Sequence, residues 1–142
     1  MIGRAKEMLL IMLLVKNVFA SGNKTIDCTK YDYKYFAIPD ILSMLICYNH
    51  TKHIVNCPPK QLYVPGYPHC TSAEKYKNNQ NDLCLARKKK LGNIQNPWNC
   101  HSFLTCVHGI STGERPCQDK SLVYNPYKDQ CQYSYQYKCQ QA

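Results

Sequence analysis

The sequence predicts a small, mostly β protein that disulfide bonds hold in two units. Three observations support this prediction: ten cysteines in 142 residues, few aliphatic core residues, and a polar stretch between two groups of cysteines. Fewer than a fifth of the residues after position 20 are Leu, Ile, Val or Phe, so a charged chain of this composition needs covalent help to fold. An even number of cysteines in an oxidising compartment indicates disulfides that compensate for a small apolar core.

Residues 1–20 have the features of a secretory signal peptide. Arg4 and Lys6 precede an apolar run at 8–15, and Val18 and Ala20 are the small residues expected before a cleavage site. The run is too short to cross a bilayer as a helix, so no transmembrane segment is expected. We therefore expect cleavage after Ala20 and a secreted, extracellular protein, in which the cysteines form disulfides rather than a metal site.

The cysteines fall into two even groups, which a polar stretch at 71–83 separates. The first group has four members: Cys28, Cys47, Cys57 and Cys70. The second group has six members: Cys84, Cys100, Cys106, Cys117, Cys131 and Cys139. We interpret 71–83 as a linker between a unit at 28–70 and a unit at 84–139. Internal pairing within each group still leaves many arrangements open.

The two units are similar to each other in sequence. The matched pairs are Ser43 with Ser102, Leu45 with Leu104, Lys60 with Lys120, Leu62 with Leu122, and Tyr67 with Tyr127. In this alignment Cys100 lies opposite Ile41 and Cys139 lies near Asn78, so the first unit lacks both cysteines. Joint loss of two bonded partners removes one bridge and leaves no unpaired thiol. The sequence therefore predicts a degenerate tandem repeat.

Turn residues and alternation predict short strands rather than long helices. The segment 41–48 fits either a strand or a short helix capped by Asp40, and its periodicity does not decide between them. In the second unit, a strand within 100–107 is followed by turns at Gly109 and Gly113. A further short strand at 122–124 ends at Asn125-Pro126.

The segment 131–139, CQYSYQYKC, alternates strictly between two faces. If it is extended, Tyr133, Tyr135 and Tyr137 lie on the same face as Cys131 and Cys139. On that face the tyrosines are either core residues beside a disulfide or part of an exposed aromatic surface.

The cysteine spacing of the second unit is Cys84-x15-Cys100-x5-Cys106-x10-Cys117-x13-Cys131-x7-Cys139. Between the cysteines lie the aromatic Phe103 in CHSFLTC, then Gly109, and then the run Leu122-Val123-Tyr124-Asn125. In these features the second unit resembles the peritrophin-A type chitin-binding domain, an invertebrate module of peritrophic-matrix proteins and many chitinases. The first unit is interpreted as a degenerate copy of the same module.

The resemblance implies a small antiparallel fold, a three-stranded sheet followed by a two-stranded hairpin, here present in tandem. It also implies a disulfide pairing of first with third, second with sixth, and fourth with fifth cysteine. In the second unit these pairs are Cys84–Cys106, Cys100–Cys139 and Cys117–Cys131. In the first unit, without its second and sixth cysteines, the implied pairs are Cys28–Cys47 and Cys57–Cys70.

The implied ligand is chitin or a related glycan of N-acetylglucosamine, a neutral polymer that is recognised by aromatic stacking and hydrogen bonds. The 12 Tyr of the sequence combine a flat apolar ring with a polar tip. Our candidate ligand-binding residues are Tyr124, Asn125, Tyr127, Tyr133 and Tyr135. Burial is the alternative for each tyrosine, since aromatic residues near a disulfide usually belong to the core. Phe103 is expected in the core, and Trp98 either covers the core or contacts sugar.

The first unit is expected to be the poorer binder because it has one bridge fewer. It also carries a glycosylation sequon at Asn49-His50-Thr51, and a glycan there would crowd a sugar site. A second sequon is centred on Asn23 in the N-terminal tail. We therefore expect a glycoprotein if either asparagine is modified.

The run Arg87-Lys88-Lys89-Lys90 stands out in a chain of net charge +9. We favour a solvated loop. The alternative is a cationic, disulfide-rich effector of antimicrobial or salivary type that acts on mucins or other anionic surfaces. Motifs for nucleic-acid recognition are absent, so no nucleic-acid partner is expected.

Neither a cofactor nor catalysis is expected. Several histidines lie near cysteines, but their spacing fits no common zinc pattern and the resemblance assigns every cysteine to a bridge, so no metal site is expected. The carboxylates are scattered and show no nucleophile or paired-acid motif. The sequence therefore predicts a non-enzymatic binding protein.

Overall fold

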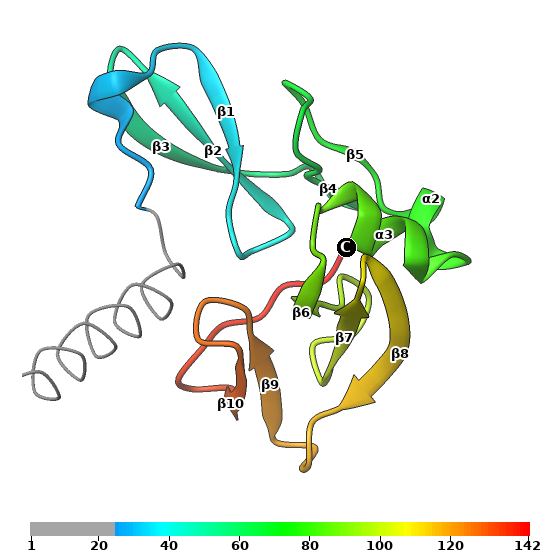
Figure 1. The fold of residues 1–142 in the computed structure, drawn as a ribbon. Helices are drawn as coiled ribbons and strands as arrows, with labels where there is room; N and C mark the ends of the chain where they lie inside the picture. The colour runs from blue at the N-terminus through cyan, green and yellow to red at the C-terminus, as the bar shows by residue number, and fades with distance from the viewer. Residues whose placement is uncertain (1–24) are drawn as a thin grey trace, which may run out of the picture.

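The computed structural model describes residues 25–142, which form two repeats of a three-stranded antiparallel sheet followed by a two-stranded hairpin (Figure 1). The predicted signal peptide and Asn23 lie outside the described residues. The elements of the N-terminal repeat are a short 3₁₀ helix, η1 (Cys28–Lys30), and the strands β1 (Lys34–Ala37), β2 (Ser43–Tyr48), β3 (Thr51–Asn56), β4 (Gln61–Leu62) and β5 (Thr71–Ser72).

Two short helices, α2 (Glu74–Lys77) and α3 (Gln80–Ala86), lead into the C-terminal repeat. Its strands are β6 (Leu91–Gln95), β7 (Ser102–Val107), β8 (Ile110–Pro116), β9 (Leu122–Asn125) and β10 (Gln130–Tyr133). The sheets have the orders β1-β2-β3 and β6-β7-β8, and the hairpins pair β4 with β5 and β9 with β10. The predicted fold class is confirmed.

The central strands β2 and β7 show the same alternation of buried and partly exposed residues. In β2, Ser43, Leu45 and Cys47 are buried while the residues between them are partly exposed, and β7 repeats this pattern. The prediction for 41–48 left strand and helix open, and the structure has a strand. Asp40 caps a turn instead of a helix, because its carboxylate accepts hydrogen bonds from the Leu42 amide and the Ser43 hydroxyl.

Each central strand turns back through two residues with positive φ. These residues are Asn49 and His50 after β2, and His108 and Gly109 after β7. Two consecutive positive φ values are typical of the tight turns that match the twist of a hairpin. The predicted strand at 122–124 is confirmed as β9, with Asn125 as its last residue.

Equivalent backbone hydrogen bonds show how the repeats align in space. The Tyr63 amide donates to the Ile41 carbonyl, and the Tyr124 amide donates to the Cys100 carbonyl, both at 2.9 Å. Tyr63 therefore occupies the place of Tyr124, one residue away from the sequence match of Leu62 with Leu122. Both tyrosines start the same pattern, Tyr-x-Pro followed by four residues and a cysteine.

All ten cysteines are bonded, and the five bridges have the pairing that the resemblance implied. The N-terminal repeat holds Cys28–Cys47 and Cys57–Cys70. The C-terminal repeat holds Cys84–Cys106, Cys100–Cys139 and Cys117–Cys131.

The two repeats share one hydrophobic core. Its buried residues come from both of them: Ile41, Leu42, Leu62 and Val64 from the first, and Leu83, Cys84, Ile94, Leu104 and Cys106 from the second and its leading helix. A smaller cluster of Cys28, Ile38, Leu45 and Cys47 lies inside the N-terminal sheet. Each repeat therefore completes the core of the other.

The stretch 71–83 differs from the expected polar linker. It contains β5 and α2 and the start of α3, and its residues Ala73, Tyr76 and Leu83 are buried in the shared core. These three apolar side chains give the stretch a packed face despite its polar composition. The domain boundaries at 28–70 and 84–139 stay a prediction.

Polar contacts also join the repeats. The Arg87 guanidinium, after α3, donates hydrogen bonds to the carbonyls of Tyr63 and Ile38 in the N-terminal repeat. The Gln95 side chain accepts a 3.0 Å hydrogen bond from the Ile41 amide. Burial lowers the pKa of Arg87 to about 10, while the nearby charge of Asp40 opposes this shift. The expectation of a fully solvated basic run is therefore wrong for Arg87, although Lys88 and Lys90 are exposed.

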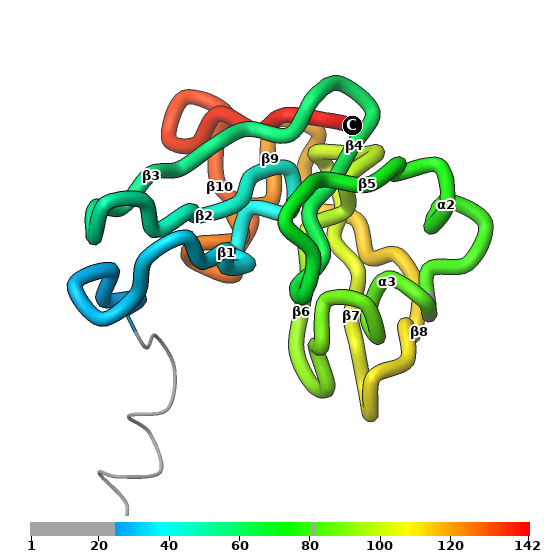
Figure 2. The backbone as a smooth tube through the Cα atoms, turned by 90° about the horizontal axis from the view of Figure 1, so that it is seen from above, coloured from blue at the N-terminus to red at the C-terminus, as the bar shows by residue number. Residues whose placement is uncertain are grey.

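The C-terminal residues also lie between the two repeats. Figure 2 shows them running beside the loop between β3 and β4, where Gln140 and Gln141 lie next to Pro58 and Pro59. The Ala142 amide donates to the Pro97 carbonyl at 2.6 Å. Within residues 25–142, no helix has the length and hydropathy that a membrane span requires.

Candidate functional site

The hairpin of the C-terminal repeat carries most of the candidate residues. The register pairs Cys131 with Tyr124 and Tyr133 with Leu122. Because alternate residues of a strand point to the same side, Tyr133 shares a face with Cys131, Tyr124 and Leu122. The Cys117–Cys131 bridge ties this face to the end of the three-stranded sheet.

Tyr133 and Tyr135 form an exposed aromatic platform. Their rings stack almost in parallel, with centroids 5.6 Å apart and an interplanar angle of 6°. They are 48% and 83% exposed, so both rings present surface to solvent. A turn stabilises the pair, because the Tyr133 amide donates to the Gln136 side chain and the Gln136 amide donates to the Tyr133 carbonyl. The condition that 131–139 is extended holds only as far as Tyr133, because the chain turns there.

A groove of about 370 Å³, the hairpin groove, lies against the same face of the hairpin. Its lining includes Phe103, Leu122, Tyr124, Gln118 and the Cys117–Cys131 bridge. The Phe103 and Tyr124 rings stack with centroids 5.0 Å apart and make an aromatic wall. Phe103 was expected in the core, but it is half-buried and lies on the face of β7 opposite the buried Ser102 and Leu104, where it lines the groove.

Asn93 and Asp129 supply the polar end of the hairpin groove. The Asn93 amide donates to Asp129 Oδ1 at 3.0 Å, and the Tyr124 hydroxyl donates to the same oxygen at 2.7 Å. Burial, followed by this hydrogen bond to Asp129, raises the pKa of Tyr124 far above its usual value. Tyr124 is therefore a neutral hydrogen-bond donor that fixes the Asp129 carboxylate at the groove.

Tyr124 and Asn125 lie where a ligand has little access to them. Tyr124 is only 2% exposed, and the buried Asn125 side chain donates to Gln132 and accepts from the Tyr127 amide. Their geometry suits a positioning role, since they shape the hairpin and its loop. Tyr127 is different, because it is 49% exposed and packs edge to face on Tyr137 at 6.4 Å. Burial and the charge of Asp40 raise the pKa of Tyr127.

The N-terminal hairpin has no such platform at the equivalent positions. By the strand pairing, Ser72 takes the place of Tyr133, and the place of Tyr135 is taken by Glu74 in α2. Leu62, Tyr63 and Val64 of this hairpin are buried. Leu62 and Val64 belong to the shared core, whereas the equally buried Val123 and Asn125 of the C-terminal hairpin lie outside it. Ser72 and Glu74 are exposed, as Tyr133 and Tyr135 are, but they carry no aromatic ring.

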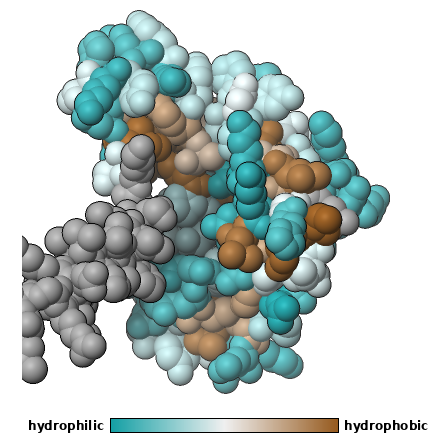
Figure 3. Space-filling view, viewed as in Figure 1, coloured by the Kyte–Doolittle hydropathy of each residue, from teal (hydrophilic) through white to brown (hydrophobic). Residues whose placement is uncertain are grey.

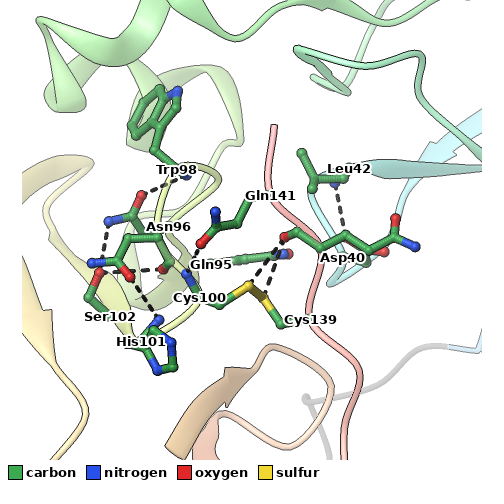
Figure 4. Close-up of a disulfide and its surroundings, with 12 residues drawn as sticks. Asp40, Leu42, Gln95, Asn96, Trp98, Cys100, His101, Ser102, Cys139 and Gln141 are labelled. Atoms are coloured by element: carbon green, nitrogen blue, oxygen red, sulfur yellow. Dashed lines mark hydrogen bonds between the residues drawn. A yellow bond between two sulfur atoms is a disulfide. The ribbon is translucent and has the colours of Figure 1, made fainter. Parts of the chain in front are cut away.

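The other candidates lie away from this platform. Trp98 packs against the shared core, and its amide donates to Asn96 beside the Cys100–Cys139 bridge (Figure 4). Asn49 occupies the exposed turn between β2 and β3, where a glycan would project from the sheet. In the described part of the chain, no three His, Cys, Asp or Glu side chains gather as metal ligands would.

Two features escaped the sequence reasoning. The shared core was missed because hydrophobic pattern alone does not say which surface covers which. The repeated Tyr-x-Pro pattern was also missed, although it was visible in the sequence and places Tyr63 and Tyr124 in equivalent buried positions. That pattern marks Tyr124 as a residue of the fold rather than of the surface.

Comparison with known proteins assigns the C-terminal repeat to a domain family. Residues 84–139 match the family model of the Chitin binding Peritrophin-A domain, and the match does not include the N-terminal repeat. No curated protein is similar enough to this chain to count as a match. Domains of this family are typically non-enzymatic, and a disulfide-rich domain of this kind is consistent with an extracellular location. The chain therefore contains one peritrophin-A chitin-binding domain, residues 84–139, which implies chitin as its ligand.

Proposed function

We propose that this is a secreted, non-enzymatic protein that binds chitin through the hairpin of its C-terminal repeat. Tyr133 and Tyr135 cover the apolar faces of N-acetylglucosamine units, and Tyr127 adds a further exposed ring. The polar groups of Gln118, Asn93 and Asp129 in the hairpin groove hydrogen-bond acetamido and hydroxyl groups. The buried Tyr124 and Asn125 hold these residues in position.

The observation that carries this proposal is the exposed tyrosine pair beside a groove, inside the domain that matches the chitin-binding family. A hydrophobic pair in solvent is a cost unless a partner covers it, and a flat ring pair fits the flat apolar face of a pyranose. The Cys117–Cys131 bridge anchors strand β10 of this hairpin, which limits the conformational entropy that is lost on binding.

The test is retention of the oxidised protein on insoluble chitin. Replacing both rings, with Tyr133→Ala and Tyr135→Ala, should weaken binding about ten- to hundredfold, because each aromatic contact contributes roughly 0.5–1.5 kcal/mol beyond its buried area. Tyr67→Ala is the matched control, since Tyr67 is similarly exposed but lies in the N-terminal repeat. Unchanged retention of a correctly bridged double variant would place the site elsewhere.

The positive charge favours a second function, the binding of anionic surfaces. The net charge is +9, and Lys88 and Lys90 are exposed, so the protein has cationic surface available for mucins or other anionic partners. Salt separates the two functions. Stacking on chitin should survive about 1 M salt, whereas attraction to anionic surfaces should vanish there, because the screening length falls to roughly 3 Å.

A further inference from the structure

The hairpin groove does not end at the C-terminal repeat. A second hollow of about 260 Å³, the junction groove, shares Asn93 and Asp129 with it and is also lined by Arg87, Lys89 and Pro39. A third hollow of about 380 Å³, the N-terminal groove, shares Pro39 and Tyr127 with the junction groove. The three hollows therefore follow one another from the C-terminal hairpin across the junction to the N-terminal sheet.

Tyr127 stands where the junction groove and the N-terminal groove meet. It is half exposed, and its edge-to-face contact with Tyr137 holds the ring in place. Pro39, on the opposite side of the boundary, belongs to the turn before β2. An aromatic ring at this position is available to a ligand in either groove, and it is contributed by the C-terminal repeat.

The N-terminal groove has an apolar floor with a charged rim. Ile38 and Leu45 line it together with Ile54, which is 60% exposed, and Lys52 lies at its edge. Figure 3 shows apolar surface, in brown, on the side of the N-terminal repeat that turns toward the rest of the molecule. Ile54 differs from other exposed apolar residues in that it adjoins Ile38 and Leu45 along one hollow, so a ligand with an apolar face can cover the three together.

The side chains that line the three hollows differ in polarity from one hollow to the next, and this order suits one kind of ligand. The tyrosine platform and the Phe103–Tyr124 wall are aromatic, the junction offers the Asn93 amide, the Asp129 carboxylate and the Lys89 ammonium group, and the far end is apolar. Apolar surfaces that alternate with hydrogen-bonding groups match a sugar polymer, whose rings have apolar faces and polar edges. The hairpin and N-terminal grooves lie at the lower end of the roughly 300–1,000 Å³ range of ligand sites and the junction groove lies below it, so the continuity points to an extended ligand.

We propose that a single chitin chain lies along all three hollows, so that the N-terminal repeat extends the binding site of the C-terminal repeat. This inference rests on the proposed function, because the path begins at the tyrosine platform. The N-terminal repeat then contributes to binding without an aromatic platform of its own. Affinity should rise with oligomer length until the ligand reaches Ile54, beyond the length that the hairpin groove alone accommodates.

The experiment compares N-acetylglucosamine oligomers of increasing length by calorimetry on the oxidised full chain. Ile54→Ser should leave short oligomers unaffected and weaken long ones about three- to tenfold, because an apolar contact is lost only at the far end. Tyr127→Ala should have a similar effect that begins at a shorter length. Ile110→Ser is the matched control, since Ile110 is 52% exposed on β8 and lines none of the three hollows.

Amide hydrogen exchange gives a second readout that does not depend on a variant. A long oligomer should protect 51–54 as well as 130–133, while a short one should protect only the hairpin. Protection that stays at the hairpin for every length, with unchanged affinity of Ile54→Ser, would overturn the extended site and leave the proposed function intact. No binding of any oligomer to the native protein would instead overturn the proposed function itself.

Two other occupants of the N-terminal groove would also overturn the inference. If Ile54→Ser leaves sugar binding unchanged but alters the sedimentation of the protein, the hollow holds a second copy of the chain. If it leaves sugar binding unchanged but alters hydrogen exchange in the residues before Thr25, the hollow holds the N-terminal segment of the same chain, since Thr25 and Ile26 border it.

Discussion

The two repeats have the same strand order but use their hairpins differently. In the C-terminal repeat three disulfides hold a hairpin whose tyrosines face solvent. In the N-terminal repeat two disulfides suffice, because Leu62 of its hairpin packs into the shared core and Ile41 lies in that core at the position that Cys100 occupies in the C-terminal repeat. Packing stands here in place of a covalent bond, and the positions of Tyr133 and Tyr135 are taken by exposed residues without a ring.

The shared core accounts for a first repeat that has the same strand order with one bridge fewer. A disulfide stabilises mainly by limiting the unfolded chain, whereas a buried isoleucine stabilises by leaving water. Both contributions are of the order of a few kcal/mol, so one can substitute for the other. The consequence is that the N-terminal repeat depends on its neighbour, while Tyr133 and Tyr135 of the C-terminal repeat stay exposed.

The largest expected effect comes from removing the bridge that the N-terminal repeat lacks. Replacing Cys100 and Cys139 together by serine should lower the free energy of unfolding by about 4 kcal/mol, because the bridge spans 39 residues. Denaturant titration of the oxidised protein would measure this loss. A loss below about 1 kcal/mol would show that packing already secures this repeat and that the contrast between the repeats is mistaken.

The next largest effect should come from the residue that takes the place of the bridge. Ile41→Ala should destabilise the protein by roughly 2–4 kcal/mol, because it leaves a cavity in the shared core. Fluorescence and circular dichroism should report one common transition for both repeats. Ile110→Ala, at an exposed position, is the control and should change stability by less than about 0.5 kcal/mol. Two separate transitions in the native protein would contradict a shared core.

Alkaline pH should affect the buried tyrosines of both repeats. The folded protein raises the pKa of Tyr124, by burial first and the Asp129 contact second, and burial raises that of Tyr63. A tyrosine whose folded pKa exceeds its unfolded value contributes stability below pH 10, and this contribution is lost as the pH rises above 10. The free energy of unfolding should fall by up to about 1.4 kcal/mol per pH unit over the range in which Tyr124 is ionised in the unfolded chain but neutral in the fold, and by less for Tyr63.

Tyr124→Phe isolates the contribution of Tyr124 to this pH dependence. Phenylalanine cannot ionise, so the variant should lose less stability between pH 10 and the alkaline limit than the native protein. Urea titration at several pH values would measure the difference. Parallel stability curves for the two proteins would show that Tyr124 ionises as readily in the fold as in the unfolded chain.

The smallest effect should come from restoring one tyrosine to the N-terminal hairpin. Ser72 is exposed at the position of Tyr133, so Ser72→Tyr should change stability by less than about 0.5 kcal/mol. Chitin retention should also change little, because Glu74 in α2 cannot provide the second ring of a stacked pair. A clear gain in retention would show that a single exposed tyrosine is enough, and that the platform of the C-terminal repeat is not specific.

Much of the fold could be predicted from the sequence, because the signals that predict it lie close together along the chain. Cysteine spacing and turn residues act over short distances, so they identified the tandem fold class, β9 and the C-terminal chitin-binding domain. The alternation at 131–139 left open whether the segment is extended, because alternation of residue types does not exclude the turn that follows Tyr133. The polar appearance of 71–83 hid Ala73 and Tyr76, whose burial depends on a core built from both repeats.

The site was predictable only as a group of tyrosines. Sequence alone treated Tyr124, Tyr127, Tyr133 and Tyr135 alike, although the structure buries the first and exposes the other three. The basic run likewise gave no sign that Arg87 crosses to two carbonyls of the other repeat. Exposure and long-range hydrogen bonding depend on which distant segment lies opposite a side chain, and residue type does not encode that directly.

By itself, the sequence determined the covalent framework of this protein: an even set of cysteines whose spacing specifies the domain at 84–139. The pairing within that framework is what the resemblance to the domain family implies, since spacing alone leaves many pairings open. Only the tertiary structure decided that Leu62 and Val64 enter a core built from both repeats, and that the hollows on the two repeats share lining residues. Those features arise from the contact of surfaces far apart in sequence, where burial is a property of both partners.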